Sequence, residues 1–87
     1  MKIIYASQAA EDLKYWEMFD KKIVQRINQL LDDIQKHPFT GIGKPEPLKF
    51  NKSGYWSRRI NQLHRLVYKV QDDIVYIAQC RWHYLKD

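Results

Sequence analysis

The strongest periodic pattern in the chain lies between residues 20 and 37. Six apolar residues fall on one stripe of a helix with ~3.6 residues per turn: Ile23, Val24, Ile27, Leu30, Leu31 and Ile34. Asp20 offers a side-chain oxygen that caps such a helix, and His37-Pro38 ends it because proline disfavours helical geometry in the preceding residue. The pattern predicts an amphipathic helix with a buried stripe.

Two further elements are predicted ahead of this helix. Residues 2–6 are β-branched and aromatic at their centre, which is typical of a short strand. Ser7 offers an N-cap oxygen for a helix over about residues 8–19, with Ala9, Leu13 and Trp16 on its buried side. The first half of the chain is therefore expected to run strand, helix, helix.

Proline and glycine gather between residues 38 and 47, which hold all three prolines and two of the three glycines. A stiff irregular loop is predicted there. Four strands are predicted afterwards, at about residues 48–50, 55–60, 64–70 and 74–80. The last of them is apolar on both sides, so we expect a central strand.

Alternation in residues 64–70 assigns side chains to opposite faces of the sheet. Leu66, Tyr68 and Val70 share one face. The other face carries Arg65, Val67 and Lys69. The strand therefore presents one apolar side and one partly cationic side.

The order of these elements indicates an α+β domain. Two N-terminal helices are expected to pack on one face of a mainly antiparallel sheet, which leaves the opposite face free for function. A chain of 87 residues can build one hydrophobic core but not two, so residues 1–87 are predicted to form a single domain.

Composition and hydropathy predict a soluble protein. The chain is 45% hydrophobic and 29% charged, as an ordinary globular domain is. No apolar run approaches the ~20 residues of a transmembrane helix, and the start of the chain turns polar too early for a signal peptide. The single cysteine, Cys80, cannot form an internal disulfide. We therefore expect a cytoplasmic protein without a membrane partner.

Charge is divided unevenly along the chain. Residues 1–43 hold six Lys or Arg and six Asp or Glu, whereas residues 44–87 hold nine and four. The whole net charge of +5 therefore belongs to the second half, which suggests one face that meets a polyanion. An ordinary basic surface with no such partner is an equally good interpretation of charge alone.

Glu46 lies between Pro45 and Pro47 and is the only acid from residue 44 to residue 69. A lone carboxylate weakens the binding of a polyanion to a cationic surface, so its presence suggests a general base. The alternative is a solvated loop glutamate with no chemical role.

Three arginines lie on two adjacent predicted strands. Pairing of residue 60 with residue 64 places Arg59 opposite Arg65, and a slip of one residue places Arg58 there instead. Two guanidinium groups on one face repel each other unless an anion lies between them, and arginine donors suit a phosphate. Solubilising charges on an edge strand are the alternative interpretation.

His83 and Tyr84 follow the last predicted strand and are either parts of a site or, as the alternative, an exposed histidine and a core or lid aromatic. Cys80-x-x-His83 resembles half of a zinc site, but the other histidines, His37 and His64, form no second close pair. The sequence also lacks a Gly-rich phosphate loop and a carboxylate cluster for Mg²⁺. Phosphoryl chemistry in this protein is therefore expected to use neither a metal nor a cofactor.

Four blocks of sequence together resemble one family. They run from Gly43 to Lys49, from Ser53 to Ile60, from His64 to Tyr68, and from Cys80 to Tyr84. In order and spacing they are similar to the YoeB/Txe toxins of bacterial type II toxin-antitoxin systems, over essentially the whole chain. This family belongs to the RelE/ParE-like superfamily with a microbial-RNase-like fold, and its members are ribosome-dependent mRNA interferases.

The resemblance implies a catalytic set of four residues. Glu46 would be the general base, His83 the general acid and Arg65 the group that stabilises the phosphate. Tyr84 would help to position the scissile phosphate or the acid.

The resemblance also implies RNA-binding residues beside this set. Lys49 and Arg59 would support binding and charge stabilisation, with Lys44, Lys52 and Arg58 as weaker candidates. The chain continues past Tyr84 through Leu85, Lys86 and Asp87, whereas relatives usually stop near the tyrosine.

A function and a set of partners follow from the resemblance. The toxin would cleave mRNA on the small ribosomal subunit to leave a 2′,3′-cyclic phosphate, and so inhibit translation. A YefM-like antitoxin would hold it inactive in a complex that also acts as a DNA-binding repressor, and a homodimer is a further candidate assembly. The charge asymmetry alone fits an alternative, a non-catalytic RNA- or ribosome-binding module.

Overall fold

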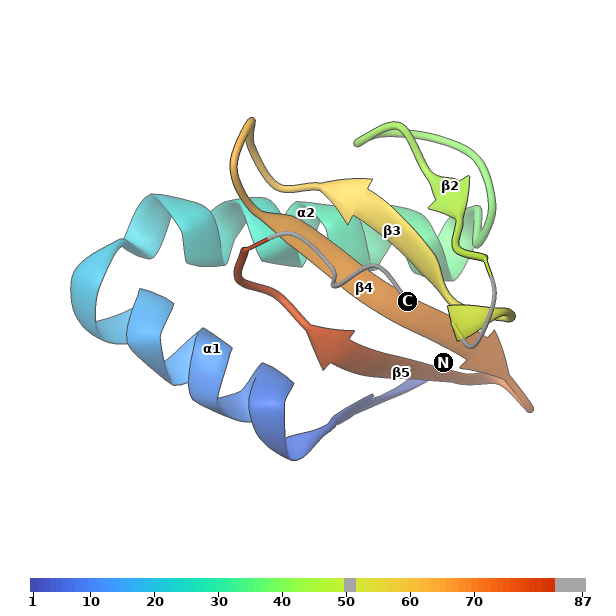
Figure 1. Cartoon of the computed structure of the whole chain (residues 1–87), viewed down its shortest axis with the longest axis horizontal. Coiled ribbons are helices and arrows are strands. Elements are labelled where there is room, and N and C mark those ends of the chain that lie inside the picture. The colour runs from blue at the N-terminus through green and yellow to red at the C-terminus, as the bar shows by residue number, and fades with distance from the viewer. Residues whose placement is uncertain (50–51, 83–87) are drawn as a thin grey trace.

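The computed structural model describes residues 1–49 and 52–82, which form two helices and five strands (Figure 1). In chain order the elements are β1 (Lys2–Tyr5), α1 (Ser7–Phe19), α2 (Lys21–Lys36), β2 (Glu46–Pro47), β3 (Trp56–Arg59), β4 (Arg65–Gln71) and β5 (Ile74–Gln79). This content confirms the predicted α+β class.

Helix α2 forms as its apolar stripe predicts. The Asp20 carboxylate accepts hydrogen bonds from the backbone N–H groups of Lys22 and Ile23, which confirms the predicted cap. The helix ends at Lys36, two residues before Pro38, which has no backbone donor to extend it. Val24 is half-buried and the other stripe residues are buried: Ile23, Ile27, Leu30, Leu31 and Ile34.

The predicted cap of the first helix is wrong. Ser7 is the first residue of α1, and Ala6 occupies the N-cap position without a side-chain hydrogen bond. The backbone N–H of Ala6 instead donates to the carbonyl of Ile77, 2.9 Å away. Because β1 is held against β5 up to this point, sheet pairing sets the start of the helix rather than a capping side chain.

The sheet has the strand order β1-β5-β4-β3-β2. Strand β1 pairs with β5 in parallel, and all other neighbours are antiparallel. Strand β5 is flanked on both sides, as its apolar sequence predicts. In Figure 1 the strands lie in front of α2, and α1 lies beside β5, so both helices pack on one side of the sheet.

Strands β1, β4 and β5 match their predicted bounds to within one residue at each end, and the other two strands differ as follows. A strand is expected at residues 48–50, of which residue 50 lies outside the described residues; residues 48 and 49 are not in a strand, and the sheet contains β2 at Glu46–Pro47 instead. The predicted loop of residues 38–47 therefore loses its last two residues to the sheet. Strand β3 covers Trp56–Arg59 rather than residues 55–60. Both differences arise because pairing with a neighbouring strand, which local propensity does not report, decides where a strand begins.

The two faces of the sheet differ as the alternation in β4 predicts. On the helix side, Leu66, Tyr68 and Val70 belong to the core or pack against it. The opposite side carries Arg65 and Lys69, which are partly buried, and Val67, which is buried outside that core cluster. We call this second side the outer face.

Candidate active site

The loop before β2 places Glu46 at the edge of the sheet. Gly43 has a φ of 80°, and a Cβ there would lie 2.9 Å from Leu30 Cδ2 and 3.1 Å from Arg58 Cβ. Glycine is therefore required for the loop to approach this closely. The Gly43 carbonyl accepts a 2.7 Å hydrogen bond from Arg59 N–H, and Glu46 then pairs with Ser57 of β3.

Glu46 and Arg65 meet on the outer face. Arg65 Nη1 lies 3.4 Å from Glu46 Oε1 and 3.4 Å from Ser57 Oγ. The Glu46 side chain is 50% exposed and that of Arg65 is 17% exposed. A carboxylate that accepts protons and a guanidinium that binds phosphate oxygens therefore stand together, open to solvent.

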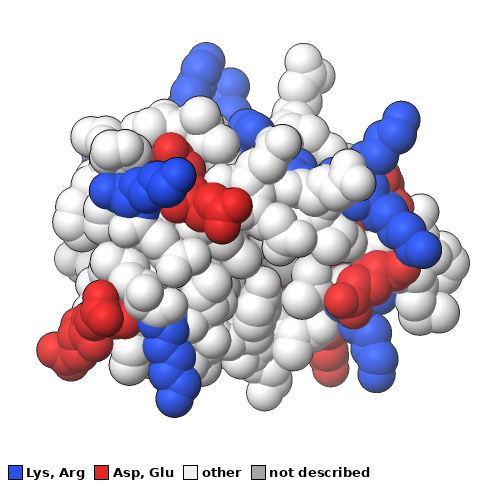
Figure 2. Space-filling view, turned by 180° about the vertical axis from the view of Figure 1, so that it is seen from behind, with Lys and Arg blue, Asp and Glu red and all other residues white. Residues whose placement is uncertain are grey.

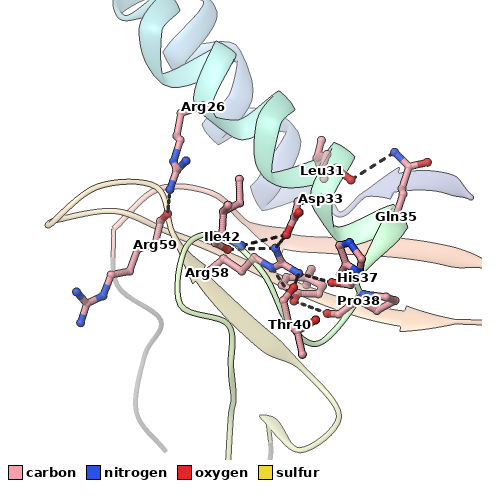
Figure 3. Close-up of polar contacts among 11 residues, drawn as sticks. Arg26, Leu31, Asp33, Gln35, His37, Pro38, Thr40, Ile42, Arg58 and Arg59 are labelled. Atoms are coloured by element: carbon pink, nitrogen blue, oxygen red, sulfur yellow. Dashed lines mark hydrogen bonds and ion pairs between the residues drawn. The ribbon is translucent and has the colours of Figure 1, made fainter.

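Arg59 adds a second cation to this pair. It lies directly opposite Arg65 in the β3–β4 register, which confirms the first of the two predicted registers. Its side chain is exposed and points away from the helices (Figure 3). Two guanidinium groups side by side repel each other, so an anion bound between them relieves the repulsion.

The prediction that Arg58 contributes to an RNA-binding surface is wrong. Its side chain is 0% exposed and is directed toward α2 and the loop that follows it (Figure 3). All five of its N–H donors are used. Their acceptors are the Asp33 carboxylate, the Tyr68 hydroxyl, and the carbonyl oxygens of His37, Thr40 and Ile42.

Arg58 therefore holds the loop that leads to Glu46. Its three carbonyl acceptors lie within residues 37–42, and the Tyr68 hydroxyl donates a further 2.7 Å bond to the carbonyl of Pro38 in the same segment. Asp33 contributes again, because its Oδ2 accepts from the Ile42 backbone N–H. One buried guanidinium thus ties α2, β4 and the loop to β3.

The Asp33–Arg58 pair predicts a dependence of stability on acid pH. The hydrogen bond from Arg58 holds the pKa of Asp33 below its ordinary value of 3.8. The unfolded state therefore binds more protons than the folded state in acid. The contribution of Asp33 to the free energy of unfolding is complete above about pH 4, and it is lost as the pH falls through the lower pKa of the folded state.

We expect Asp33→Asn to have a lower free energy of unfolding than wild type, and this deficit to be larger at about pH 7 than at about pH 3. Urea denaturation of both proteins at both pH values measures this difference. Asp32→Asn, at the exposed neighbouring position, is the control. A difference between wild type and Asp33→Asn that is the same at the two pH values would contradict the assignment.

Residues 80–82 are held from both sides. Asp12 and Trp16 of α1 bind the backbone of Cys80, with Asp12 Oδ2 accepting from its N–H at 3.0 Å and Trp16 Nε1 donating to its carbonyl at 2.9 Å. Trp82 then donates its N–H to His64 Nδ1 at 2.7 Å and accepts from Arg65 N–H at 3.0 Å. The backbone of Trp82 therefore lies against that of Arg65.

The thiol of Cys80 is protected by the fold. It is buried against the Ala9 carbonyl, at 3.6 Å, and burial raises its pKa to about 12. We expect alkylation by iodoacetamide at about pH 8 to be at least ~10²-fold slower in the native protein than in guanidinium chloride, because only the thiolate reacts. Mass spectrometry of the alkylated fraction over time measures the two rates, and equal rates would contradict the burial.

The other predicted site residues are distributed as follows. Lys44 and Lys49 are exposed in the segments that flank β2, and Lys52 is half-exposed. None of these three lysines forms an ion pair with the carboxylates of residues 1–49 and 52–82. His83 and Tyr84 lie outside the described residues.

Three supporting residues were missed by the sequence analysis. Ser57 places a hydroxyl beside Arg65, His64 binds the backbone of Trp82, and Asp12 binds that of Cys80. Asp12 carried a signal, because it shares the buried side of α1 with Ala9 and Trp16, where a carboxylate needs a partner. The sequence gives no such indication for Ser57 and His64, because their roles depend on which group of another segment lies beside them.

Charge on the molecule is segregated by face. Seen from behind, on the side of α1 and α2, Lys and Arg are interspersed with Asp and Glu (Figure 2). Strands β3, β4 and β5 contain no acid, and their outer face presents Arg59, Arg65 and Lys69. This distribution supports the outer face as the side that meets an anion.

The described part of the chain has neither a metal-binding cluster nor a membrane-spanning helix. No three His, Cys, Asp or Glu side chains in residues 1–49 and 52–82 gather into a group that could bind a metal ion. None of the helices in these ranges combines the length and the apolar character needed to span a membrane.

Comparison with known proteins identifies the family. A family model described as the YoeB-like toxin of bacterial type II toxin-antitoxin systems matches residues 5–84. Toxin YoeB of Escherichia coli K12 is 55% identical, over 97% of this chain and 100% of its own length.

Solved structures agree with this match. The YoeB dimer from Staphylococcus aureus superposes with a TM-score of 0.91 at 52% identity, over 97% of this chain and 98% of that one. The heterotetrameric YoeB-YefM toxin-antitoxin complex from the same organism gives a TM-score of 0.90 at 52% identity, with the same coverage of both chains.

The fold is that of a small α+β toxin, with a carboxylate and a guanidinium paired on the outer face of its sheet. The chain belongs to the YoeB family of toxins from bacterial type II toxin-antitoxin systems.

Proposed function

We propose that this toxin is a metal-independent endoribonuclease that cleaves mRNA on the ribosome and thereby inhibits translation. The observation that carries the proposal is the meeting of Glu46 and Arg65. These residues are nineteen positions apart in sequence, yet their side chains lie 3.4 Å apart on an open, cationic face. The alternative interpretation, a solvated glutamate with no chemical role, does not explain why Glu46 lies beside Arg65.

The proposed reaction needs one base, one acid and one anion-stabilising group. Glu46 takes the proton of a ribose 2′-hydroxyl, whose oxygen attacks the adjacent phosphorus. The bond from phosphorus to the 5′-oxygen breaks, and His83 protonates that leaving oxygen. The products are a 2′,3′-cyclic phosphate and a 5′-hydroxyl, and no metal ion is required for this proton balance.

Arg65 and Arg59 are assigned to the phosphate. Negative charge builds on the non-bridging oxygens as the 2′-oxygen attacks, and positioned cationic donors stabilise it by roughly 10²–10³ in rate for each donor. Arg65 is well placed because its Nη1 donates both to Glu46 Oε1 and to Ser57 Oγ, which orients the guanidinium group. Lys44 and Lys49 would bind flanking RNA, and Tyr84 would position the phosphate or the acid.

The arrangement of the last described residues supports the role of His83. Trp82, which precedes His83 in sequence, is hydrogen-bonded through its carbonyl to the backbone of Arg65. The chain therefore lies against Arg65 at Trp82, one position before His83 in the sequence.

We also propose a YefM-like antitoxin and a second copy of this chain as partners. The support is the YoeB-YefM complex and the YoeB dimer formed by the Staphylococcus aureus relatives. An antitoxin segment that covers the outer face would block access of RNA to Glu46 and Arg65, and its complex with the toxin is the candidate DNA-binding repressor.

Cleavage of a defined mRNA, with and without ribosomes, tests the proposed activity. Products are analysed by their end groups, and we expect cyclic phosphate and 5′-hydroxyl ends in the ribosome-containing reaction. Binding to ribosomes without strand scission at any toxin concentration would replace the nuclease with the alternative function, a non-catalytic RNA-binding module.

A further inference from the structure

A cation flanked by two aromatic rings lies on the outer face, away from Glu46. Lys69 Nζ is 5.1 Å from the ring centroid of Tyr55 and 5.4 Å from that of Tyr76. Tyr76 lies directly opposite Lys69 in the β4–β5 register, and all three side chains are half-buried. Two strands, β4 and β5, and the residue just before β3 thus converge on one ammonium group.

Within residues 1–49 and 52–82, no carboxylate forms an ion pair with this ammonium group. Arg58 and Arg65 form ion pairs with acids in the described ranges, and Lys69 does not. Strands β4 and β5, on which Lys69 and Tyr76 lie, contain no acidic residue. The positive charge is therefore available to a ligand, while the two rings restrict where it can move.

The cluster is continuous with the candidate active site. Lys69 follows Arg65 by four residues on the same strand and the same face, which separates their Cα atoms by about 13 Å. Arg59 lies beside Arg65 on the neighbouring strand. A track of cations therefore runs along β4 from the Glu46–Arg65 pair to the two tyrosines.

We propose that Tyr55, Lys69 and Tyr76 form a binding subsite for a nucleotide that flanks the cleaved linkage in single-stranded RNA. Lys69 contacts a backbone phosphate and a base stacks against a tyrosine ring. Cations that follow the backbone, combined with aromatic rings that stack on bases, are how sheet surfaces bind single strands. An acidic peptide could bind the Lys69 ammonium group, but it would not explain the two tyrosine rings beside that group. The subsite rests on the proposed function for the identity of its ligand.

The test measures binding of RNA that cannot be cleaved. Fluorescent 2′-O-methyl oligonucleotides lack the attacking hydroxyl, so anisotropy reports binding alone. We expect Lys69→Ala to weaken binding of a probe of about ten nucleotides by ~3–10-fold and to reduce the salt slope of binding by about 0.7. Binding of a dinucleotide probe, whose single phosphodiester cannot contact Arg65 and Lys69 together, should be unchanged when it occupies the Glu46–Arg65 site.

Two further variants complete the test. Tyr76→Leu should also weaken the longer probe, by ~5–10-fold, because base stacking is lost. Lys14→Ala removes an exposed cation on α1, on the other side of the molecule, and should leave both probes unaffected. Thermal unfolding of each variant verifies that the sheet is intact.

The outcomes separate the subsite from the nuclease. Unchanged binding of the longer probe to Lys69→Ala would overturn the subsite, whether or not wild type cleaves mRNA. Weaker binding of the cognate antitoxin with unchanged RNA binding would make this face a protein-docking surface and also overturn it. Weaker RNA binding in a protein that never cleaves would support the subsite and refute the nuclease.

Discussion

Replacement of Glu46 by glutamine is expected to slow mRNA cleavage on ribosomes by ~10²–10⁴-fold. Glutamine keeps the shape of the side chain and its contact with Arg65 but cannot accept the proton of the 2′-hydroxyl. Since Glu46 is half-exposed and not part of the core, the fold should be preserved. The rate of formation of cyclic phosphate ends measures the effect.

Two comparisons make this result specific to the base. Glu17→Gln changes an exposed acid on α1 and should cleave at the wild-type rate. His83→Gln removes the proposed acid and should lose activity to a similar degree. Cleavage by the Glu46 and His83 variants at the unmutated rate would refute the assigned mechanism.

Replacement of Arg58 by methionine is expected to lower the free energy of unfolding by about 3–5 kcal/mol. The substitution leaves Asp33 without its ionic partner and three loop carbonyls without their donors. Arg58→Lys should lose part of this stability, because an ammonium group has three donors where the guanidinium uses five. Urea denaturation measures the differences.

The neighbouring arginine provides the control for Arg58. Arg59 is exposed on the opposite face of the same strand, so Arg59→Met should change the free energy of unfolding by no more than about 0.5 kcal/mol. Instead it should impair the binding of RNA. Equal losses of stability in the two methionine variants would show that the Arg58 hydrogen bonds do not hold the loop.

The contrast between Arg58 and Arg59 shows what a local pattern reports. Strand alternation requires adjacent residues to point to opposite faces, and the sequence predicts the strand correctly. Which arginine enters the interior depends on Asp33, which lies 25 residues earlier in the chain. A charged residue is expected at the surface unless such a partner is known, so the local pattern gives no reason to remove Arg58 from the RNA-binding candidates that the resemblance implies.

The loop and the start of α1 show the same limit. Proline and glycine predict correctly that the chain leaves helical geometry after His37, but not that Glu46 and Pro47 join β3 as a strand. Ser7 has the right chemistry for a cap, yet pairing of β1 with β5 moves the start of the helix by one position. In each case the prediction from local preference is wrong because a tertiary contact overrides that preference.

The sequence alone determined the class of the fold, the buried stripe of α2, the two faces of β4, and Glu46 and Arg65 as residues of interest. These features depend on near neighbours, whose spacing decides which side chains share a face. Only the tertiary structure decided that Glu46 reaches Arg65, that Arg58 is buried, and that Lys69 lies between two tyrosines. Those contacts join residues far apart in sequence, and they form because packing of the whole core fixes the positions of the strands.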